Sequence, residues 1–489
     1  MGISPRNPAT RSTRGFNAAK TDRLGDWGTF SLSADAEIRQ SLRVLRAKSR
    51  HLAANNDYFK QFLRLLKIHV VGAQGIRLQN KAKARDGRSD RAANDLIESA
   101  WLRQCRRGAF DVTGMLSGRD AQKLFIETLA RDGECLVRLV HNFPNEFGFA
   151  VQFLEPDHLD EALNKKLANG NLIRMGVEYD RWDRPVAYWL LRSHPGDSSM
   201  PQPGGWFNQH QRIPADEIVH EYTVERSRQG RGVPWSHTAA ERLQMLGGFE
   251  YAALVNARAG ASKMGFYTKT GADDLGEEEY EGDGQDDDGD FYEEAEPGVF
   301  GKLPAGWEFK EYNPAFPNGE IELFSKAMLR GGASGLGVSY HSLTNDLTDV
   351  NFSSIRQGVL DSRDYYRDLQ GFTSEHFLDR VFTAWLTMAL LKQALGALDL
   401  ADFERLCQPV WRARGWDWVN PLQDQAAAEK ALKSRTKTLA KILADQGEDL
   451  EDHLEQLAEE EQLAHSYGID INSIKDGTNG KTTVRPSDP

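Results

Sequence analysis

The feature that most constrains the fold is an alanine-rich run at residues 239–262, AAERLQMLGGFEYAALVNARAGAS. It is predicted to form one helix of roughly 36 Å, at 1.5 Å per residue. Gly247 and Gly248 each cost about 1 kcal/mol relative to alanine inside a helix, so tertiary packing must compensate for them. The small side chains let neighbouring backbones approach closely, so we expect other helices beside this one. Three alanines are predicted to make these packing contacts: Ala253, Ala257 and Ala261.

The composition is that of a globular chain. Of its 489 residues, 40% are hydrophobic, enough to form a core for roughly two to four domain-sized units. No run of about 18 apolar residues occurs, and the N-terminus lacks the apolar core of a secretory signal. We therefore expect neither a membrane span nor export. The cysteines are odd in number and far apart, which favours reduced structural thiols over disulfides or a zinc site: Cys105, Cys135 and Cys407.

The negative charge is concentrated in one segment. Residues 273–296 contain 14 acidic residues and no lysine or arginine. The formal net charge is -12, so the chain without these 14 acids carries +2. Self-repulsion and low hydrophobicity predict a disordered insert or a solvated flap, and the spacing fits a calcium-binding loop poorly. The acids of interest in this insert are Asp273, Glu277, Asp286, Asp288 and Glu293.

The rest of the chain shows an α+β pattern. Residues 1–33 have scattered basic residues and no sustained period, which predicts a flexible arm. Helical spacing begins near Ala34, and a short strand is predicted between Gly72 and Gly75. Apolar segments between Asn, Pro, Gly and Asp then predict a series of strands: 135–140, 149–155, 173–179, 186–191 and 217–223. The α+β region therefore covers roughly 35–235.

Three helical regions are predicted in the C-terminal part. Residues 353–395 form one long kinked helix or two helices with a strongly apolar second half. Charged helices follow at roughly 422–444 and 448–465, before a polar tail. The second of them has a narrow apolar stripe: Leu450, Leu454 and Leu457.

A glycine- and hydroxyl-rich segment at 331–354, GGASGLGVSYHSLTNDLTDVNFSS, separates two helical patterns. Glycine adopts left-handed dihedral angles at little cost, so Gly331, Gly332, Gly335 and Gly337 are predicted to end or loosen the preceding helix. A connection of about twenty residues is longer than most inside a compact domain, and such loops are usually functional or disordered. On these residues alone, a plain surface loop is the simpler interpretation.

No catalytic motif is indicated. The closest match to a phosphate-binding loop, NGKTT at 479–483, has Lys475 where the first glycine belongs. Ser334 is followed directly by Gly335, so the nucleophile pattern G-x-S-x-G is not met. His158 has the chemistry of an acid or base, although a turn at a strand end is the simpler interpretation. Three acids beside a predicted strand offer magnesium ligands, but ion pairing is their commoner role: Asp132, Glu134 and Glu155.

An ordered series of motifs gives a family resemblance. The series is HLAANNDYFKQFLRLLKIHVVGAQGIRLQ, RDGECLVRL, VQFLEPDHL, GVEYDRWDRPVAYWLL, RIPADEIVHEYTVERSRQGRGVPW, the alanine-rich run and LGVSYHSLTNDLTDVNFSSIRQG. Each motif alone is weak. Their order and spacing over about 35–470 resemble the portal proteins of tailed bacteriophages, in the lambda-like portal family.

The resemblance implies an α+β portal fold with long stem and wing helices. Copies would form a ring, commonly of twelve subunits, at one capsid vertex, and double-stranded DNA would pass through it without sequence specificity. The implied partners are the terminase large subunit, a head-tail adaptor and the major capsid protein. No enzyme activity, cofactor, metal or membrane is implied, and the protein would reside in the virion after assembly in the host cytoplasm.

The parts of the family can be assigned along this chain. In order they are a flexible arm (1–33), the wing (34–238), a stem helix (239–262), the clip (263–318) with the acidic insert (273–296), a second stem helix (319–332), the tunnel loop (333–354), wing helices (355–421), a helical crown (422–470) and a flexible tail (471–489).

The tunnel loop of the family projects into the channel, so the resemblance makes its polar residues channel-lining: Ser339, His341, Ser342, Thr344, Asn345, Asp346, Thr348, Asp349 and Asn351. A channel should not grip DNA, because each counterion released by a basic contact adds affinity. Hydroxyls, amides and two acids suit that requirement. The acidic insert would guide DNA or offer a docking surface near terminase or the adaptor. The alternatives are a minor capsid or head-completion protein without a channel, and a metal-dependent hydrolase.

Overall fold

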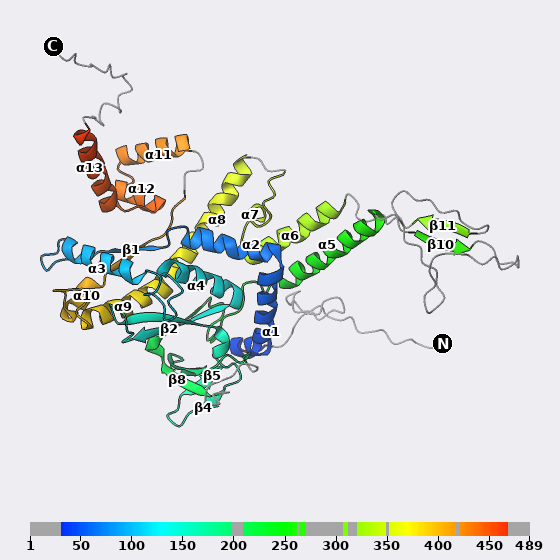
Figure 1. Ribbon diagram of the computed structural model, residues 1–489, viewed down its shortest axis with the longest axis horizontal. Helices are drawn as coiled ribbons and strands as arrows, with labels where there is room; N and C mark the ends of the chain where they lie inside the picture. The colour runs from blue at the N-terminus through cyan, green and yellow to red at the C-terminus, as the bar shows by residue number, and fades with distance from the viewer. Residues whose placement is uncertain are drawn as a thin grey trace, which may run out of the picture.

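The structure has a mixed body of helices and sheets from which further helices extend (Figure 1). The computed structural model describes residues 31–197, 209–261, 265–269, 307–311, 320–348, 352–416 and 421–467. Its α-helices are α1 (Ala34–Asn55), α2 (Asp57–Leu66), α3 (Arg91–Gln104), α4 (Gly118–Asp132), α5 (Ala240–Ala261), α6 (Glu320–Leu336), α7 (Tyr340–Thr344), α8 (Phe352–Phe372), α9 (Asp379–Leu391), α10 (Phe403–Leu406), α11 (Pro421–Lys433), α12 (Leu439–Gln446) and α13 (Leu450–Ser466). Short π-helical segments follow α2 (Lys67–Val71) and join α8 to α9 (Thr373–Leu378).

The strands form antiparallel sheets. They are β1 (Arg77–Asn80), β2 (Glu134–His141), β3 (Phe149–Leu154), β4 (Lys165–Lys166), β5 (Leu172–Arg174), β6 (Val177–Tyr179), β7 (Pro185–Leu191), β8 (His210–Pro214), β9 (Ile218–Tyr222), β10 (Gly265–Lys269), β11 (Trp307–Glu311) and β12 (Pro409–Arg412). A three-stranded sheet has the order β3-β2-β9, with Leu136 opposite both Leu154 and His220, and a five-stranded sheet has the order β4-β5-β6-β7-β8. Two-stranded ribbons pair β1 with β12 and β10 with β11. The expected mixture of helix and sheet is confirmed.

Local sequence signals explain how α4 leads into the central strand β2. Ser117 accepts a hydrogen bond from the Asp120 amide, and the Asp120 carboxylate binds back to the Ser117 amide, which completes a capping box. The helix ends at Gly133, whose φ of 87° favours glycine. Strand β2 then begins at Glu134. The predicted strand at 135–140 is therefore correct, with one extra residue at each end.

The main core is aromatic and joins distant parts of the chain. Trp101 on α3 has ring-centroid distances of 5.5 Å to Phe382 and 5.0 Å to Trp385, both on α9. Trp411 on β12 also contacts Trp101, at 6.1 Å. Phe125 on α4 stacks on Phe377 at 4.6 Å. Such rings bury large areas, so this cluster fixes α3, α4, α9 and β12 in one body.

The buried carboxylate of Glu134 joins the three-stranded sheet to α1 and to the segment that leads to α5. Glu134, fully buried, accepts hydrogen bonds from Arg231 Nε (2.9 Å), Arg46 Nη2 (2.8 Å), His220 Nε2 (2.9 Å) and the Gly232 amide (3.1 Å). Burial alone would raise the pKa of Glu134, but Arg231 and His220 hold that pKa well below its usual range. The carboxylate therefore stays ionised and bridges α1, β2, β9 and the segment that leads to α5.

Arg231 extends the same network into the second sheet. Its guanidinium is fully buried and also donates to three carbonyl oxygens, at 3.0 to 3.2 Å: Pro156, Leu159 and Met175. These carbonyls flank or precede strands of the five-stranded sheet. All the polar atoms of this buried side chain thus have partners, which a buried charge requires.

Three predicted elements differ in the structure. Residues near Gly72 complete a π-helical turn, and the strand begins only at Arg77. The segment 173–179 forms two strands, because Met175 and Gly176 have positive φ and make a tight turn. The C-terminal region has three helices in place of two, since Arg435 adopts a φ of 56° and breaks the helix between α11 and α12.

Of the four glycines predicted to end or loosen the preceding helix, only Gly337 ends it. Helix α6 continues through Gly331, Gly332 and Gly335 to Leu336, and Gly337, with a φ of 71°, ends it. A Cβ atom at Gly331 would lie 1.8 Å from Arg242 Nη1, and one at Gly335 would lie 2.9 Å from Thr238 Oγ1. The glycines therefore let α6 approach the start of α5 closely. The boundary predicted at 332 is wrong for this reason, and residues 333–336 are helical rather than loop.

The substitution Glu134→Gln is expected to destabilise the fold by about 3–5 kcal/mol, because it leaves Arg231 and Arg46 buried without a balancing charge. The measurement is the free energy of unfolding in denaturant at pH 7. The difference from the wild type should shrink at pH values below the usual range of a carboxyl group, since the native Glu134 contributes its stability only while it is ionised.

Glu127→Gln is the matched control, because Glu127 forms a half-exposed ion pair with Lys67 at 2.9 Å. Its loss should cost about 0–1 kcal/mol. Equal effects of the two substitutions would contradict the role assigned to Glu134.

Candidate functional site

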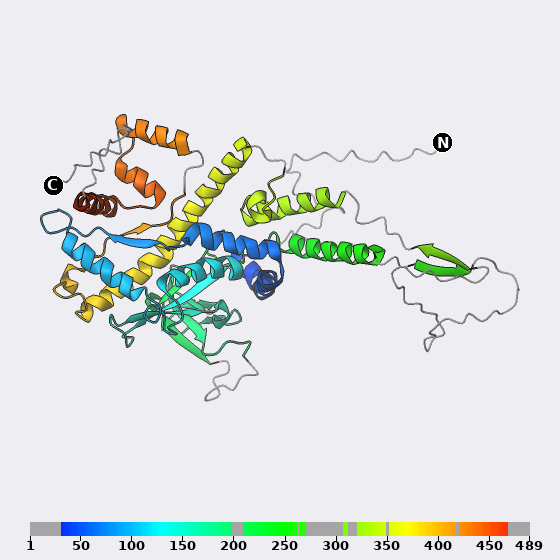
Figure 2. The same cartoon turned by 45° about the horizontal axis from the view of Figure 1, so that its top comes forward.

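Helices α5 and α6 leave the body side by side, as Figures 1 and 2 show from two directions. Apolar residues surround α5 rather than occupying one face. Helix α6 covers one side of it, where the rings of Phe249 and Phe324 lie 4.9 Å apart. The other sides expose large apolar side chains: Met245, Tyr251, Leu254 and Val255 on α5, and Leu323 on α6. Large apolar side chains exposed together on a projecting pair of helices mark a surface suited to contact with another molecule.

An apolar groove lies between the two helices near the body. It has a volume of about 480 Å³. Its apolar lining consists of Met245, Leu246, Phe249, Phe324 and Met328. The exposed apolar surface therefore contains a concave site as well as protruding side chains.

The predicted packing alanines are placed differently from one another. Ala253 is buried, and Ala257 is exposed on the same helix. The side chain of Ala261 lies outside the described residues. The burial of Ala253 agrees with a packing role inside the subunit. The packing role of Ala257 stays a prediction, because this residue is exposed in the single subunit.

The segment after α6 is more ordered than a plain loop. It contains the short helix α7, which begins at the N-cap Ser339 and ends at Asn345 with a left-handed φ of 56°. Ser339 Oγ donates to Ser342 Oγ at 2.7 Å, and Thr344 Oγ1 donates to the Tyr340 carbonyl at 2.9 Å. The predicted channel hydroxyls at these three positions are thus used in local hydrogen bonds.

Asp346 ties this segment together. Its carboxylate accepts hydrogen bonds from Thr348 Oγ1 at 2.5 Å and from Tyr340 Oη at 2.8 Å. Lys326 Nζ on α6 lies 3.7 Å from the same carboxylate and donates to Thr348 Oγ1 at 3.2 Å. His341 Nδ1 lies 2.8 Å from the carbonyl oxygen of Asp346. The hydrogen bonds from Thr348 and Tyr340 and the charge of Lys326 hold the pKa of Asp346 well below its usual range.

The exposed tip of the segment is Asn345, Leu347 and Thr348. Leu347 is 64% exposed, although it is a large apolar residue. The sequence prediction selected polar residues only and therefore missed Leu347. No signal in the sequence separates this exposed leucine from a buried one. Asp349 and Asn351 of the predicted set lie outside the described residues.

The acids considered as magnesium ligands are mostly engaged in ion pairs. Asp132 is bound by Arg50 and Arg131, each at 2.8 Å, and Glu134 by the network described above. His158 belongs to a 3₁₀ turn at the end of β3, where its Nδ1 lies 2.9 Å from the Leu191 carbonyl oxygen. The ion-pairing role predicted for Asp132 and Glu134 and the turn predicted at His158 are confirmed.

A different trio, Glu155, Asp157 and His194, places its ligand atoms within 4.8 Å of one another. Asp157 is also paired with Arg50 at 2.5 Å, so a cation there would compete with a guanidinium. Among the described residues, no helix is long and apolar enough to cross a bilayer. The acidic insert residues Asp273, Glu277, Asp286, Asp288 and Glu293 lie outside the described part of the chain.

The fold is a mixed helix-and-sheet body with a projecting helix pair that exposes large apolar side chains. The sequence matches the model of the family described as phage portal protein, lambda family, over residues 20–370. The chain belongs to the lambda family of phage portal proteins. It is a portal protein of a phage head, and its family is structural rather than catalytic.

Similar proteins align with most of the length of this chain. A probable portal protein of Halomonas phage phiHAP-1 is 38% identical, and the alignment covers 99% of this chain and 94% of that protein. Portal protein B of Escherichia phage lambda is 21% identical, with 91% and 89% covered. A solved structure of the neck of an empty GTA particle aligns with 84% of this chain and 94% of its own, at 15% identity and a TM-score of 0.43.

The substitution Asp346→Asn is expected to loosen α7 without unfolding the body, because it removes the charge that faces Lys326 and weakens two hydrogen bonds. The measurement is hydrogen exchange of residues 340–348, which should speed up by roughly threefold to tenfold. The pKa of Asp346 is low, so protection in the wild type should not depend on protonation of Asp346 between pH 5 and 8.

Asp361→Asn serves as the control, since Asp361 is exposed on α8 and accepts one side-chain hydrogen bond, from Gln357 at 2.7 Å. Unchanged exchange in Asp346→Asn would show that the carboxylate does not hold the segment.

Proposed function

We propose that copies of this chain form a ring, commonly of twelve subunits, at one vertex of the phage capsid. Double-stranded DNA is packaged and ejected through its central channel. The terminase large subunit docks during packaging, and a head-tail adaptor and the major capsid protein contact the ring. Assembly takes place in the host cytoplasm. The family membership supports this function, and one observation in this chain supports it most: the projecting helix α5 exposes several large apolar side chains in the single subunit.

Ring closure follows from the position of this surface. The groove between α5 and α6 and the exposed residues farther along α5 are different surfaces of one subunit. Two different surfaces that bind each other make a head-to-tail contact, which closes into a ring when the rotation allows. In this arrangement α5 and α6 are the stem helices, and the apolar side chains that face solvent in one subunit become buried between neighbours.

The segment 337–348 is the proposed channel lining. It follows the stem helix α6 directly and is attached to it through Lys326 and Asp346. Its exposed tip contains no lysine or arginine. Neutral and apolar groups make only weak contacts with phosphate, which suits a channel through which DNA must slide. Asp346 acts as an internal brace together with the Thr348 hydroxyl, and the proposed weak contact comes from Asn345 and Leu347.

Leu254→Asp is expected to abolish ring formation and leave the subunit folded. Leu254 is 58% exposed in the single subunit, so the folded subunit tolerates a carboxylate there. In a ring, the same carboxylate would be buried unpaired, at a cost of roughly 3–5 kcal/mol per interface. Light scattering after size-exclusion chromatography gives the mass, and negative-stain images show whether a central hole is present.

Leu102→Asp is the matched control, because Leu102 is similarly exposed, at 62%, on α3 of the body. It should still form rings. Rings of Leu254→Asp, or monomers and sheets of the wild type, would contradict the proposed stem interface and favour a head protein without a channel.

The double substitution of Leu347 and Thr348 by lysine is expected to slow DNA packaging, because a ring of added charges would bind phosphate. The measurement is the amount of DNA packaged per head over time, at two salt concentrations. The defect should weaken at the higher salt concentration, since each phosphate contact releases counterions.

The same two positions replaced by glutamine provide the control, which changes polarity without adding charge. Packaging that is equally fast in the lysine and glutamine variants would show that this tip does not face the DNA.

A further inference from the structure

The three C-terminal helices have almost no core of their own. In the described residues 421–467, the only fully buried side chains are Leu443 and Asp449. Helices of 8 to 17 residues are marginal in water without tertiary packing. Something outside the single subunit must therefore cover these helices if they are to persist.

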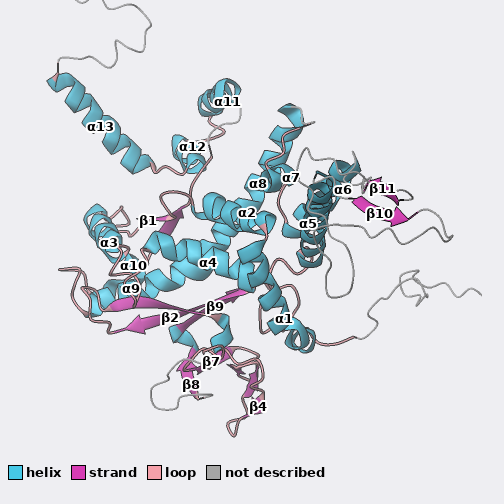
Figure 3. Ribbon diagram, turned by 45° about the vertical axis from the view of Figure 1, so that its right-hand side comes forward, coloured by secondary structure: helices cyan, strands magenta, loops and turns pink. Residues whose placement is uncertain are grey.

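Helix α13 is the least covered of the three. It has no buried residue and contains six acidic residues without a lysine or arginine. Leu454, Leu457 and Glu461 recur at spacings of three and four, so they lie on one face. In Figure 3, α13 extends outward from α12 and away from α11. This face, defined by Leu454, Leu457 and Glu461 with the exposed Glu460 at its edge, is called the acidic face below.

The base of α13 is fixed to the body, which sets the direction of the helix. Asp449 caps α13 by accepting from the Glu451 amide at 2.8 Å, and Arg412 on β12 donates to Asp449 at 3.3 Å. Gly415 and Gly447 cross closely, since a Cβ atom at Gly415 would lie 2.2 Å from the Gln446 carbonyl carbon.

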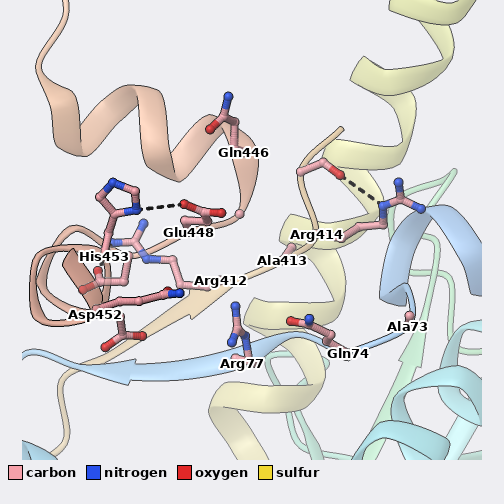
Figure 4. A pocket seen from close by; sticks show the side chains of 15 residues that line it. Ala73, Gln74, Arg77, Arg412, Ala413, Arg414, Gln446, Glu448, Asp452 and His453 are labelled. Carbon is pink, nitrogen blue, oxygen red and sulfur yellow. Dashed lines mark hydrogen bonds and ion pairs between the residues drawn. The ribbon is translucent and has the colours of Figure 1, made fainter. Parts of the chain in front are cut away.

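A cleft of about 520 Å³ separates this base from the body (Figure 4). Figure 4 shows Arg77 and Arg412 on the body side and Glu448, Asp452 and His453 on the side of α13. Within the cleft, His453 pairs with Glu448 at 3.3 Å. The charges near the base are therefore balanced locally, whereas those farther along α13 are not.

A basic surface, opposite in charge to the acidic face, lies at the turn between α11 and α12. Residues 430–441, KALKSRTKTLAK, contain five basic residues and no acid, and we call them the basic turn. Leu432 and Leu439 are exposed within it. Its ion pairs are local, from Lys433 to Glu429 and from Lys437 and Lys441 to Asp445. Among the described residues, no ion pair joins the basic turn to α13.

We propose that the acidic face of α13 docks on the basic turn of the neighbouring copy in the ring. The two surfaces are complementary in charge, and each has exposed leucines that the contact would bury. Because the printed ion pairs of the basic turn stay within α11 and α12, we assign its pairing with α13 to neighbouring subunits. The proposal rests on ring formation, and it assigns to α13 the role of linking adjacent subunits independently of the stem helices.

The test measures hydrogen exchange of α13 in the full-length protein. In rings at low salt, the amides of 452–464 should exchange roughly tenfold more slowly than in the monomeric Leu254→Asp variant. The double variants E460K/E461K and K430E/R435E should each form rings but lose this protection. Combining all four substitutions should restore it, because the charges are then exchanged between the two surfaces.

Charge reversal at unrelated exposed sites, Asp86→Lys with Glu404→Lys, is the matched control and should leave the exchange of α13 unchanged. Wild-type rings in which α13 exchanges as fast as in the monomer would overturn the docking and leave the ring intact. Absence of wild-type rings would overturn the ring and the docking together. Protection that survives K430E/R435E but disappears when residues 1–30 are removed would show that the basic arm, rather than the basic turn, covers α13.

Discussion

The contact between Glu134 and Arg231 is the interaction on which the rest of the structure depends. One carboxylate and one guanidinium, both fully buried, join α1, the two larger sheets and the segment that leads into α5. A buried ion pair of this kind adds little net stability relative to apolar packing. Removal of one partner is nevertheless strongly destabilising, because the other charge is left buried and unpaired. Its value lies in position: the base of the projecting helix pair is set relative to the body by directional bonds rather than by apolar contact alone.

Close backbone approach provides the second constraint, and it explains what the sequence concealed. The alanine-rich helix was predicted nearly to its ends, because composition and length suffice to identify a long helix. The role of Gly331 and Gly335 was not predictable in the same way. Glycine at the end of a helix and glycine beneath a tight helix crossing look identical in a sequence. Only the positions of Arg242 and Thr238, about ninety residues earlier in the chain, distinguish them.

The candidate site was predicted in outline for the same reason. Motif order assigned the segment 333–354 to the tunnel loop of the family, whereas its residues alone favoured a plain surface loop, and its first four residues belong to α6. Its interior was not predictable, because the partners of its hydroxyls and of Asp346 depend on a local fold that includes Lys326 of another helix. Polar residues near a turn are as often caps as ligands. An exposed leucine such as Leu347 has no sequence signature that separates it from a buried one.

The position of Asp346 changes the physical account of a low-friction channel. A carboxylate that repelled DNA directly would need to face the lumen with its charge uncompensated. Here Thr348, Tyr340 and Lys326 engage it, so its charge is largely balanced within the subunit. Weak contact would then come from a braced tip that presents the amide of Asn345 and the apolar side chain of Leu347, because the Thr348 hydroxyl is already bound to Asp346 and Lys326. Rigidity matters, because a mobile loop would adapt to the phosphate backbone and gain contacts, whereas a braced tip keeps its contacts few at every step of the DNA.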